Sequence, residues 1–383
     1  MVEKNLGISR ELLIHPGETI SDLLESRGMS QKELAQRVGV SEAFLCEVIH
    51  GRKDISKGLA MGLQYALDIP ASFWLNLQAN YDAELLETQE EETVRKEEYT
   101  SIEDINEIVD HLRKRKIVQA GISRKQEIIG LRKYLRISDL SRLSGLAPVT
   151  AKEKKTVSSD GLRHVNPTMI GAWICICKGM ELSSEVSQGF DPETTDEMVS
   201  DIKGVMTQPK RDCLKTIGET LARFGISFST LPAFRGAPVR AFISHEQDDS
   251  YKFVLSLSDP SADSFWFSLF HGFGHIANGD VPRGGYYIDF WTNGCMPAIK
   301  VGQRKNRDDD RELAADRFAK SALMNTEIYS RFVTQGIFTY KFILEYSRTH
   351  DVPSFVLLGL LHGDGYVSDE CYRKHIPKYE WKD

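Results

Sequence analysis

The chain has 383 residues, of which 41% are hydrophobic and 27% charged, and its formal net charge is −7. This composition is ordinary for a soluble globular protein, and the length leaves room for two or three domains. No apolar run approaches 18 residues and the first residues lack a signal-peptide pattern, so we expect a cytoplasmic protein without a membrane span. The six cysteines form no Cys-x-x-Cys pair, which favours a reducing compartment. The acidic balance excludes a chain-wide nucleic-acid footprint, so any DNA contact must come from a local patch.

The first elements along the chain are three predicted helices. Residues 16–27 place apolar side chains on one helical face, and Gly28 ends that helix. Ser30 opens a capping box at the start of a helix over residues 31–38. A three-residue turn containing glycine leads to a helix over residues 42–49, which stops at a His-Gly pair. Two short helices joined in this way predict a helix-turn-helix.

In a helix-turn-helix the second helix enters the major groove by its N-terminal end, while the first crosses the DNA backbone. An αα-hairpin that serves only packing is the alternative. The second helix has two glutamates and no basic residue, which predicts modest affinity per monomer, strong salt dependence and a homodimer on a paired site. The residues expected to contact bases or phosphates are Gln31, Lys32, Ser41, Glu42, Ala43, Phe44, Glu47, Arg52, Lys53 and Lys57.

Most of residues 13–82 resemble the HigA class of XRE-type antitoxins. The similarity is carried by His15-Pro-Gly-Glu18, by the helix-turn-helix series, and by Pro70-Ala-Ser-Phe-Trp-Leu-Asn-Leu-Gln-Ala-Asn-Tyr-Asp82. The resemblance implies binding to operator DNA, autoregulation, and usually a toxin encoded alongside. A stripe at helical spacing in the last motif is equally explained as core and dimer packing: Phe73, Trp74, Leu77 and Tyr81.

A predominantly helical connecting region is expected over residues 83–205. Its first part, Glu84–Glu98, is rich in glutamate and is typical of a solvated helix or linker. A helix with apolar residues at Ile105, Ile108, Val109 and Leu112 should follow, ending in a basic run. Further helices are expected over residues 128–135 and 170–177, and a mobile loop over residues 152–160.

From about residue 213 the pattern changes to that of an α+β domain. A predicted helix over residues 214–224 precedes three alternating or apolar runs that read as strands, namely 226–231, 239–244 and 253–257. We therefore expect residues 206–383 to form a domain with a small sheet packed on helices.

The motif His271-Gly-Phe-Gly-His275 follows a long apolar run suited to a buried helix. Two histidines four residues apart project from one helical face and can share a Zn²⁺ ion. Downstream, an amphipathic helix carries Glu312 and Asp316, also four apart. Glu312 is the expected third ligand, and Asp316 would hold a ligating histidine from behind. The alternative is that these are core histidines beside a solvated helix face.

The residue after the first histidine decides the expected chemistry. In His-Glu-x-x-His peptidases this residue is a glutamate that takes a proton from zinc-bound water. Here it is Gly272, which has no side chain, so we expect little or no hydrolysis. Gly272 and Gly274 each cost about 1 kcal/mol in a helix interior, unless another backbone packs close. The missing side chain at Gly272 also suggests added space beside the metal, as in a ligand pocket.

The segments Ser264–His275 and Glu312–Met324 resemble the ImmA/IrrE metallopeptidase-like proteins. Those proteins typically read F-W-F-T-L-F-H-E-L-G-H and E-x-x-A-[ND]-x-F-A. By that resemblance the zinc ligands are His271, His275 and Glu312, in a zincin-like domain whose catalytic glutamate has become glycine.

The sequence thus predicts a mainly α N-terminal bundle with a helix-turn-helix (1–82), a helical middle region (83–205) and an α+β zincin-like domain (206–383). The function expected is an antitoxin-type transcriptional regulator whose last domain senses a ligand, binds a toxin or supports dimerisation. One alternative is an active zinc peptidase that uses another base, such as Asp316 or one of Tyr286 and Tyr287. Another is a repressor with a metal-free scaffold.

Overall fold

The computed structural model describes residues 13–148, 156–158, 161–163, 165–181, 186, 188–207, 212–291 and 307–379. Among these residues no helix combines the length and apolar character that crossing a membrane requires. The chain divides into two compact units, one of residues 1–96 with 122–129 and the other of residues 97–121 with 130–383. The predicted middle region contributes to both units, and the predicted three-part division stays a prediction.

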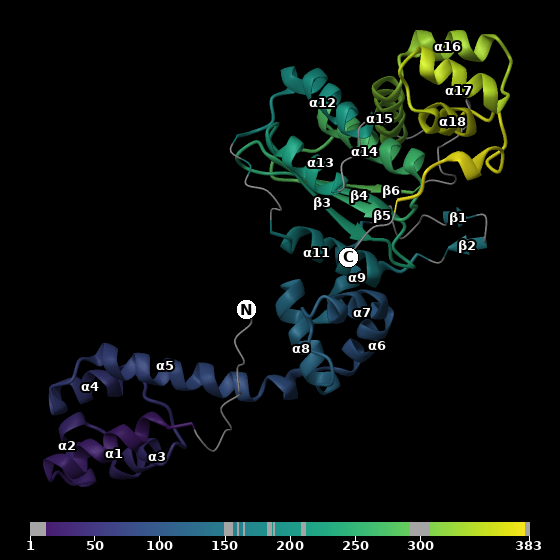
Figure 1. Ribbon diagram of the computed structural model, residues 1–383. Helices are drawn as coiled ribbons and strands as arrows, with labels where there is room; N and C mark the ends of the chain where they lie inside the picture. Colours follow the sequence, from purple (N-terminus) through teal and green to yellow (C-terminus); the bar gives the residue numbers. More distant parts are fainter. Residues whose placement is uncertain are drawn as a thin grey trace. The chain divides into compact units, whose positions relative to one another are not determined.

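Helices α1 to α5 form the body of the first unit (Figure 1). The predicted bounds of the first three helices are confirmed. Each of these helices begins and ends at capping residues that can be recognised in the sequence. Ser30 Oγ accepts a hydrogen bond from Glu33 N, and Ser41 Oγ accepts one from Phe44 N, each at 3.1 Å. Gly39 adopts the left-handed conformation (φ 74°) that the turn requires. The helices are α1 (Pro16–Arg27), α2 (Gln31–Val38), α3 (Glu42–Ile49), α4 (Lys57–Leu67) and α5 (Ala71–Thr88).

The core of the first unit is built from the inward faces of these helices. Trp74 on α5 is fully buried, as are Leu34, Leu45 and Leu63 on α2, α3 and α4. By contrast Phe73 is exposed, so the predicted aromatic stripe is divided between core and surface. Burial of these side chains holds the helix-turn-helix rigid, at roughly 1.5–3 kcal/mol for each large apolar group.

The connecting region corrects one expectation. Glu98 was expected to be solvated, but it is fully buried and pairs with Arg132 at 2.5 Å (Oε1 to Nη2). It also accepts a hydrogen bond from Leu140 N at 2.9 Å. The glutamate-rich stretch is therefore more than a solvated linker, because the Glu98 carboxylate connects α6 to Arg132 and Leu140 in the second unit. The elements here are η2 (Glu90–Thr93), α6 (Lys96–Asp104), α7 (Asn106–Lys114), α8 (Arg124–Leu135), η3 (Leu140–Arg142) and α9 (Leu143–Leu146).

A short antiparallel pair of strands corrects a second expectation. The expected loop over residues 152–160 contains β1 (Thr156–Ser158), which pairs with β2 (Gly161–Arg163). The rest of that expected loop lies outside the described residues. After this pair come α11 (Pro167–Gly179), η4 (Pro192–Thr194), α12 (Thr195–Thr207) and α13 (Cys213–Ala222).

A four-stranded mixed sheet forms the centre of the second unit. Its order is β3-β5-β4-β6, with β3 parallel to β5 and β4 antiparallel to both neighbours. The three predicted strands are confirmed, with slightly wider bounds, and β6 was not predicted. The strands are β3 (Ile226–Pro232), β4 (Val239–His245), β5 (Tyr251–Leu257) and β6 (Tyr286–Phe290).

Helices cover both faces of this sheet (Figure 1). On one face Ala241 and Ile243 of β4 join a core that includes α13 and α14. On the other, Phe242 meets Trp173 of α11 edge to face, with ring centroids 6.5 Å apart. This alternation is the period of two that places successive strand residues on opposite faces.

The predicted histidine helix is α14 (Ala262–Ala277), which is buried along nearly its whole length and packs against α15 (Arg307–Leu323). The chain continues with α16 (Thr326–Thr334), α17 (Tyr340–Thr349), α18 (Ser354–Gly363) and η5 (Arg373–His375). The predicted fold class is therefore confirmed: a helical N-terminal part is followed by an α+β region with a small sheet.

Candidate metal centre and nucleic-acid interface

The two histidines of the predicted metal site lie on one face of α14, and both are fully buried. Helix α15 approaches this helix closely where Gly274 has no side chain: a Cβ there would lie 2.8 Å from Ala315 Cα. The expectation that a nearby backbone explains this glycine is thus confirmed. The close crossing brings Glu312 and Asp316 of α15 next to His271.

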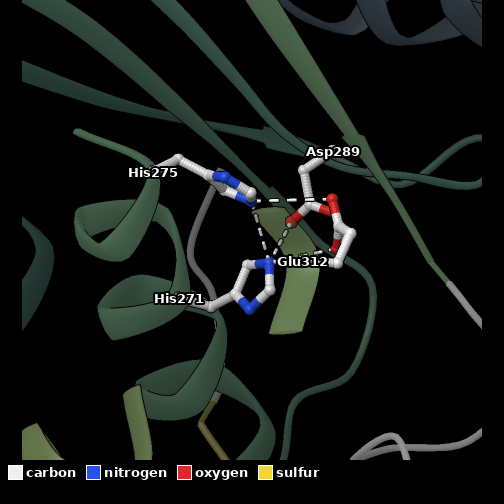
Figure 2. A group of neighbouring side chains, drawn as sticks. All are labelled: His271, His275, Asp289 and Glu312. Atoms are coloured by element: carbon white, nitrogen blue, oxygen red, sulfur yellow. Dashed lines mark hydrogen bonds and ion pairs between the residues drawn. The ribbon is translucent and has the colours of Figure 1, made fainter. Parts of the chain in front are cut away.

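The three predicted ligands converge (Figure 2). The Nε2 atoms of His271 and His275 are 3.0 Å apart. Glu312 places Oε2 at 3.4 Å from His271 Nε2 and Oε1 at 3.6 Å from His275 Nε2. Two imidazole nitrogens bound tetrahedrally to one zinc ion lie roughly 3.3 Å apart. The observed spacing is close to that value.

A carboxylate forms a hydrogen bond with the Nδ1 atom of each histidine. His271 Nδ1 donates to Asp316 Oδ1 at 2.9 Å, which places Asp316 where the sequence predicted it. His275 Nδ1 donates to Asp280 Oδ2 at 2.8 Å. Asp280 was missed, although it follows His275 by only five residues. In both rings Nδ1 therefore faces a carboxylate and Nε2 faces inward, the orientation of metal-ligating histidines.

A fourth donor was missed by the sequence analysis. Asp289 on β6 is buried, and its Oδ2 lies 3.4 Å from His271 Nε2. Tyr287, two residues earlier on the same strand, donates from its hydroxyl to Glu312 Oε1 at 2.5 Å. The available signal was the run of aromatic and β-branched residues in Tyr286–Phe290, but five residues without a neighbouring strand pattern were too few to predict β6.

A buried arginine completes the centre. Arg240 is 1% exposed, lies at a bulge in the pairing of β4 with β6, and places Nη1 3.4 Å from Asp289 Oδ2. Burial and Arg240 would lower the pKa of His271, but Asp289 and hydrogen bonds to Asp316 and Glu312 outweigh them and raise it to about 9. Although burial alone would raise the pKa of Glu312, hydrogen bonding to His271 and the charges of both histidines hold it well below its usual range.

The charges of this cluster fit a divalent cation. Protonation of both histidines cannot supply two positive charges, because two Nε2–H groups would then face each other across 3.0 Å. Two guanidinium groups and one protonated histidine still leave an excess of negative charge, since four carboxylates lie in the cluster within the described residues. The carboxylates belong to Asp280, Asp289, Glu312 and Asp316, and the guanidinium groups to Arg240 and Arg311. The donor set of two imidazoles and carboxylates suits zinc.

The space beside Gly272 is filled. A Cβ at this residue would lie 2.8 and 3.0 Å from Cε2 and Cε1 of Phe253, and nearer still to Cζ. The prediction of extra room for a ligand is therefore wrong. The ring of Phe253, fully buried against Phe228 and Phe273, occupies the space beside Gly272. The position after His271 thus faces an apolar wall and carries no carboxylate.

The predicted DNA-contacting residues lie at the start of α2, along α3, in the following loop and at the first residue of α4. Lys32, Ser41, Glu42, Ala43, Arg52, Lys53 and Lys57 are exposed, whereas Gln31, Phe44 and Glu47 are half-buried. Lys53 Nζ pairs with Glu47 Oε2 at 2.8 Å and lies 5.1 Å from the centre of the Phe44 ring. The hydrogen bond from Lys53 lowers the pKa of Glu47. One lysine expected to bind phosphate thus already has a carboxylate partner.

No protein-family model matches the chain. It is 39% identical over 69 residues to virulence-associated protein A′ of Dichelobacter nodosus, a match covering 18% of this chain and 60% of that protein. It is 32% identical over 75 residues to virulence-associated protein I of the same bacterium, covering 19% of this chain and 69% of that protein. The chain belongs to the family of virulence-associated protein I.

These relationships concern a small part of the chain. The chain spans about 60% of the length of the first of these relatives, and each match involves less than a fifth of its own residues. A solved structure, the antitoxin HigA of Pseudomonas aeruginosa with the higBA promoter, is 28% identical, with 22% of this chain and 97% of that chain covered and a TM-score of 0.20. The similar antitoxin structures correspond to the N-terminal part.

Proposed function

We propose that this protein is an antitoxin-type transcriptional regulator that binds its own operator, and that its C-terminal domain holds a metal ion without hydrolysing peptides. The observation that carries the first half is the geometry of α2 and α3: two rigid, capped helices joined at Gly39, with Ser41, Glu42 and Ala43 exposed at the leading end of the second. A helix presented in this way suits entry into a major groove.

The basic residues beside α3 support phosphate contact, while the two glutamates of α3 limit attraction to DNA in general. We therefore propose that the protein binds as a homodimer, whose two helices occupy paired half-sites. The motifs His15–Glu18 and Pro70–Asp82 are the support for an antitoxin role and for a cognate toxin as partner.

The DNA-binding proposal is tested by fluorescence anisotropy with the duplex upstream of the protein's own gene and a random duplex of equal length. The triple variant Gln31→Ala, Arg52→Ala, Lys53→Ala should lose most affinity for the first duplex and keep its helical circular dichroism. A control that removes exposed lysines elsewhere, Lys215→Ala with Lys341→Ala, should bind as wild type. Equal affinity of the wild type for both duplexes at moderate salt would reject the proposal.

For the C-terminal domain, the support is the convergence of His271, His275 and Glu312 beside the buried carboxylates of Asp289 and Asp316. A metal ion bound there would supply a positive charge that links α14 to α15. Two of the alternative bases, Asp316 and Tyr287, form hydrogen bonds with the proposed metal ligands. Asp316 holds His271 Nδ1, and the Tyr287 hydroxyl donates to Glu312.

Tyr286 is the remaining alternative base, and it lies on the opposite side of β6 from Tyr287. Its ring stacks on Phe242 at 5.4 Å, and Lys178 Nζ lies 4.1 Å from the ring centre. Phe253 closes the space at Gly272, so residue 272, where the general base of a peptidase belongs, supplies no carboxylate. This supports a binding or sensing role over catalysis.

Elemental analysis of the purified full chain tests the metal. We expect about one zinc ion per chain, lost in His271→Ala with His275→Ala. A matched control is His245→Ala, because His245 stacks on Tyr251 (4.3 Å between ring centres) and takes no part in the cluster. Retention of stoichiometric zinc by the double variant would show that the ion binds elsewhere, and a metal-free wild type would favour the scaffold alternative.

A peptidase assay separates the binding role from the active-peptidase alternative. The substrates are the partner toxin, where the neighbouring gene encodes one, and a peptide covering Glu84–Glu98. We expect no metal-dependent cleavage by the wild type. Cleavage that is abolished by His275→Ala would establish the active enzyme instead.

A further inference from the structure

We infer that Asp289 is a fourth protein ligand of the metal ion, so that the ion occupies a closed site without an open coordination position. The inference rests on the metal site proposed above and adds a residue that the His-x-x-x-His motif and Glu312 do not include. It changes the role of the ion from a possible reaction centre to a link between secondary-structure elements.

The first support is position. One donor atom from each of His271, His275, Asp289 and Glu312 can be chosen so that all four lie within 4.8 Å of one another. Figure 2 shows the two carboxylates side by side, facing the two imidazole rings. The donors come from three elements, α14, α15 and β6, so the fourth donor adds the sheet to a site otherwise built from two helices.

The second support is the pairing of β6 with β4. Asp289 lies opposite Ala241, and Tyr287 lies opposite Ile243. Ala241 and Ile243 belong to the core that contains α14, so strand alternation turns Asp289 and Tyr287 toward that helix. The same strand face thus supplies a donor beside His271 and a hydrogen bond that orients Glu312.

The third support is that the Asp289 carboxylate has no hydrogen-bond donor among the described residues. Neither of its carboxylate oxygens accepts a hydrogen bond from any residue that the structure describes, although the side chain is buried. A buried carboxylate without hydrogen bonds is costly, and such groups are usually paired or bound to metal.

A role as the counterion of Arg240 does not account for Asp289 by itself. A dedicated arginine–carboxylate pair forms short, often bidentate bonds of about 2.7–2.9 Å. Here one contact of 3.4 Å joins Nη1 to Oδ2, and Nε and Nη1 of Arg240 make no hydrogen bond within the described residues. His271 Nε2 lies at the same distance from the same oxygen, so Oδ2 sits between the guanidinium and the metal ligands.

A closed site has a defined consequence. Structural zinc sites have four protein ligands, whereas catalytic sites keep three and leave one position open. With Asp289 bound, no position remains for a substrate oxygen, in agreement with the apolar wall formed by Phe253 at Gly272. The ion would join β6 to α14 and α15, so metal loading would stabilise the C-terminal unit without activating a substrate.

Cobalt substitution of the full chain tests this inference, because the visible absorption of Co²⁺ reports its ligands. With one Co²⁺ bound per chain, the wild-type spectrum should not change on titration with azide or imidazole. Asp289→Ala should open a position: its spectrum should differ from wild type and should respond to azide. Its metal affinity, from competition with a chelating dye, should fall at least about tenfold, the lower limit found even for outer-shell changes.

The matched control is Asp263→Ala, which removes another buried aspartate, in the first turn of α14 and outside the donor set. It should retain the wild-type spectrum and its insensitivity to azide. A wild-type spectrum that shifts with azide as readily as that of Asp289→Ala would overturn the inference and leave the three-ligand site standing. Failure of the wild type to take up a stoichiometric ion would instead reject the metal site itself. The wild-type titration decides the question even where Asp289→Ala does not fold.

Discussion

The ring of Phe253 occupies the place of the side chain that Gly272 lacks. A Cβ at residue 272 would come within 2.8 Å of Cε2 and closer to Cζ, and the ring is fixed by edge-to-face contacts with Phe228 and Phe273. The absence of a side chain at residue 272 is therefore matched by a core residue that fills the space. A glutamate cannot be introduced here by one substitution without displacing that ring.

From this contact we predict that Gly272→Ala lowers the free energy of unfolding by about 1–3 kcal/mol, the usual cost of overpacking a core. Gly204→Ala is the control, since Gly204 lies within helix α12 and nothing lies within 4 Å of a Cβ placed there. The control should gain up to about 1 kcal/mol from helix propensity. Chemical denaturation of both variants measures the difference, and equal effects would contradict the contact.

The same contact predicts coupling between the two positions. Phe253→Leu frees space beside residue 272, so the double variant with Gly272→Ala should be more stable than the sum of the single effects implies. Contacting residues usually couple by about 0.5–3 kcal/mol. Strict additivity in a double-mutant cycle would show that the two residues do not compete for the same volume.

The pair formed by Glu47 and Lys53 predicts a change in DNA binding. Glu47→Gln removes a negative charge from α3 and releases Lys53, so affinity for any duplex should rise and preference for the operator should fall. One additional phosphate contact should steepen the dependence of log K on log salt by about 1. Glu87→Gln makes the same charge change at the exposed end of α5. An unchanged salt dependence in Glu47→Gln would show that Lys53 does not reach phosphate.

A histidine cap makes the first helix sensitive to pH. His15 Nδ1 accepts a hydrogen bond from Gly17 N at 2.9 Å, which requires the neutral ring. Burial lowers the pKa of His15, and nearby carboxylates, Asp54 first, oppose this only in part. The folded state thus binds a proton less readily than the unfolded chain, whose pKa is about 6.5. The hydrogen bond of the cap therefore contributes fully to the stability of the folded state above that pH, and this contribution is lost as the pH falls below it.

The expected result is weaker protection of residues 16–27 in amide hydrogen exchange as the pH is lowered below about 6.5, after correction for the intrinsic exchange rate. In His15→Asn the side-chain oxygen can cap the helix at every pH. The pH dependence should therefore be reduced in this variant. A profile identical to wild type would place the sensitive group elsewhere.

The buried pair of Glu98 and Arg132 predicts a large and asymmetric effect on stability. Arg132→Met leaves a buried carboxylate without its guanidinium, and should cost about 3–5 kcal/mol. Glu98→Gln with Arg132→Met should restore part of this loss, because the amide oxygen can still accept from Leu140 N. Lys215→Met is the control: its exposed contact with Glu219 is 3.8 Å long, and such pairs contribute about 0–1 kcal/mol. Similar losses in both would contradict the burial of Glu98.

Local signals in the sequence determined the helices of the first unit. Ser30 and Ser41 cap helices through hydrogen bonds within three residues, and Gly39 supplies a left-handed turn, so neither depends on distant parts of the chain. The histidine pair of α14 was equally readable, because residues four apart on a helix always share a face. Glu312 and Asp316 followed from the same rule on α15.

Only the tertiary structure decided what surrounds those histidines. Asp289 reaches the site through the register of β6 on β4, and Phe253 reaches Gly272 from β5. Strand register depends on pairing between segments far apart in the sequence, and a shift of one residue would turn Asp289 to the other face of the sheet. Helical spacing is a property of a single segment, so the sequence by itself determined that His271, His275 and Glu312 could bind a metal ion. The packing of distant strands decided which side chains close the site around them.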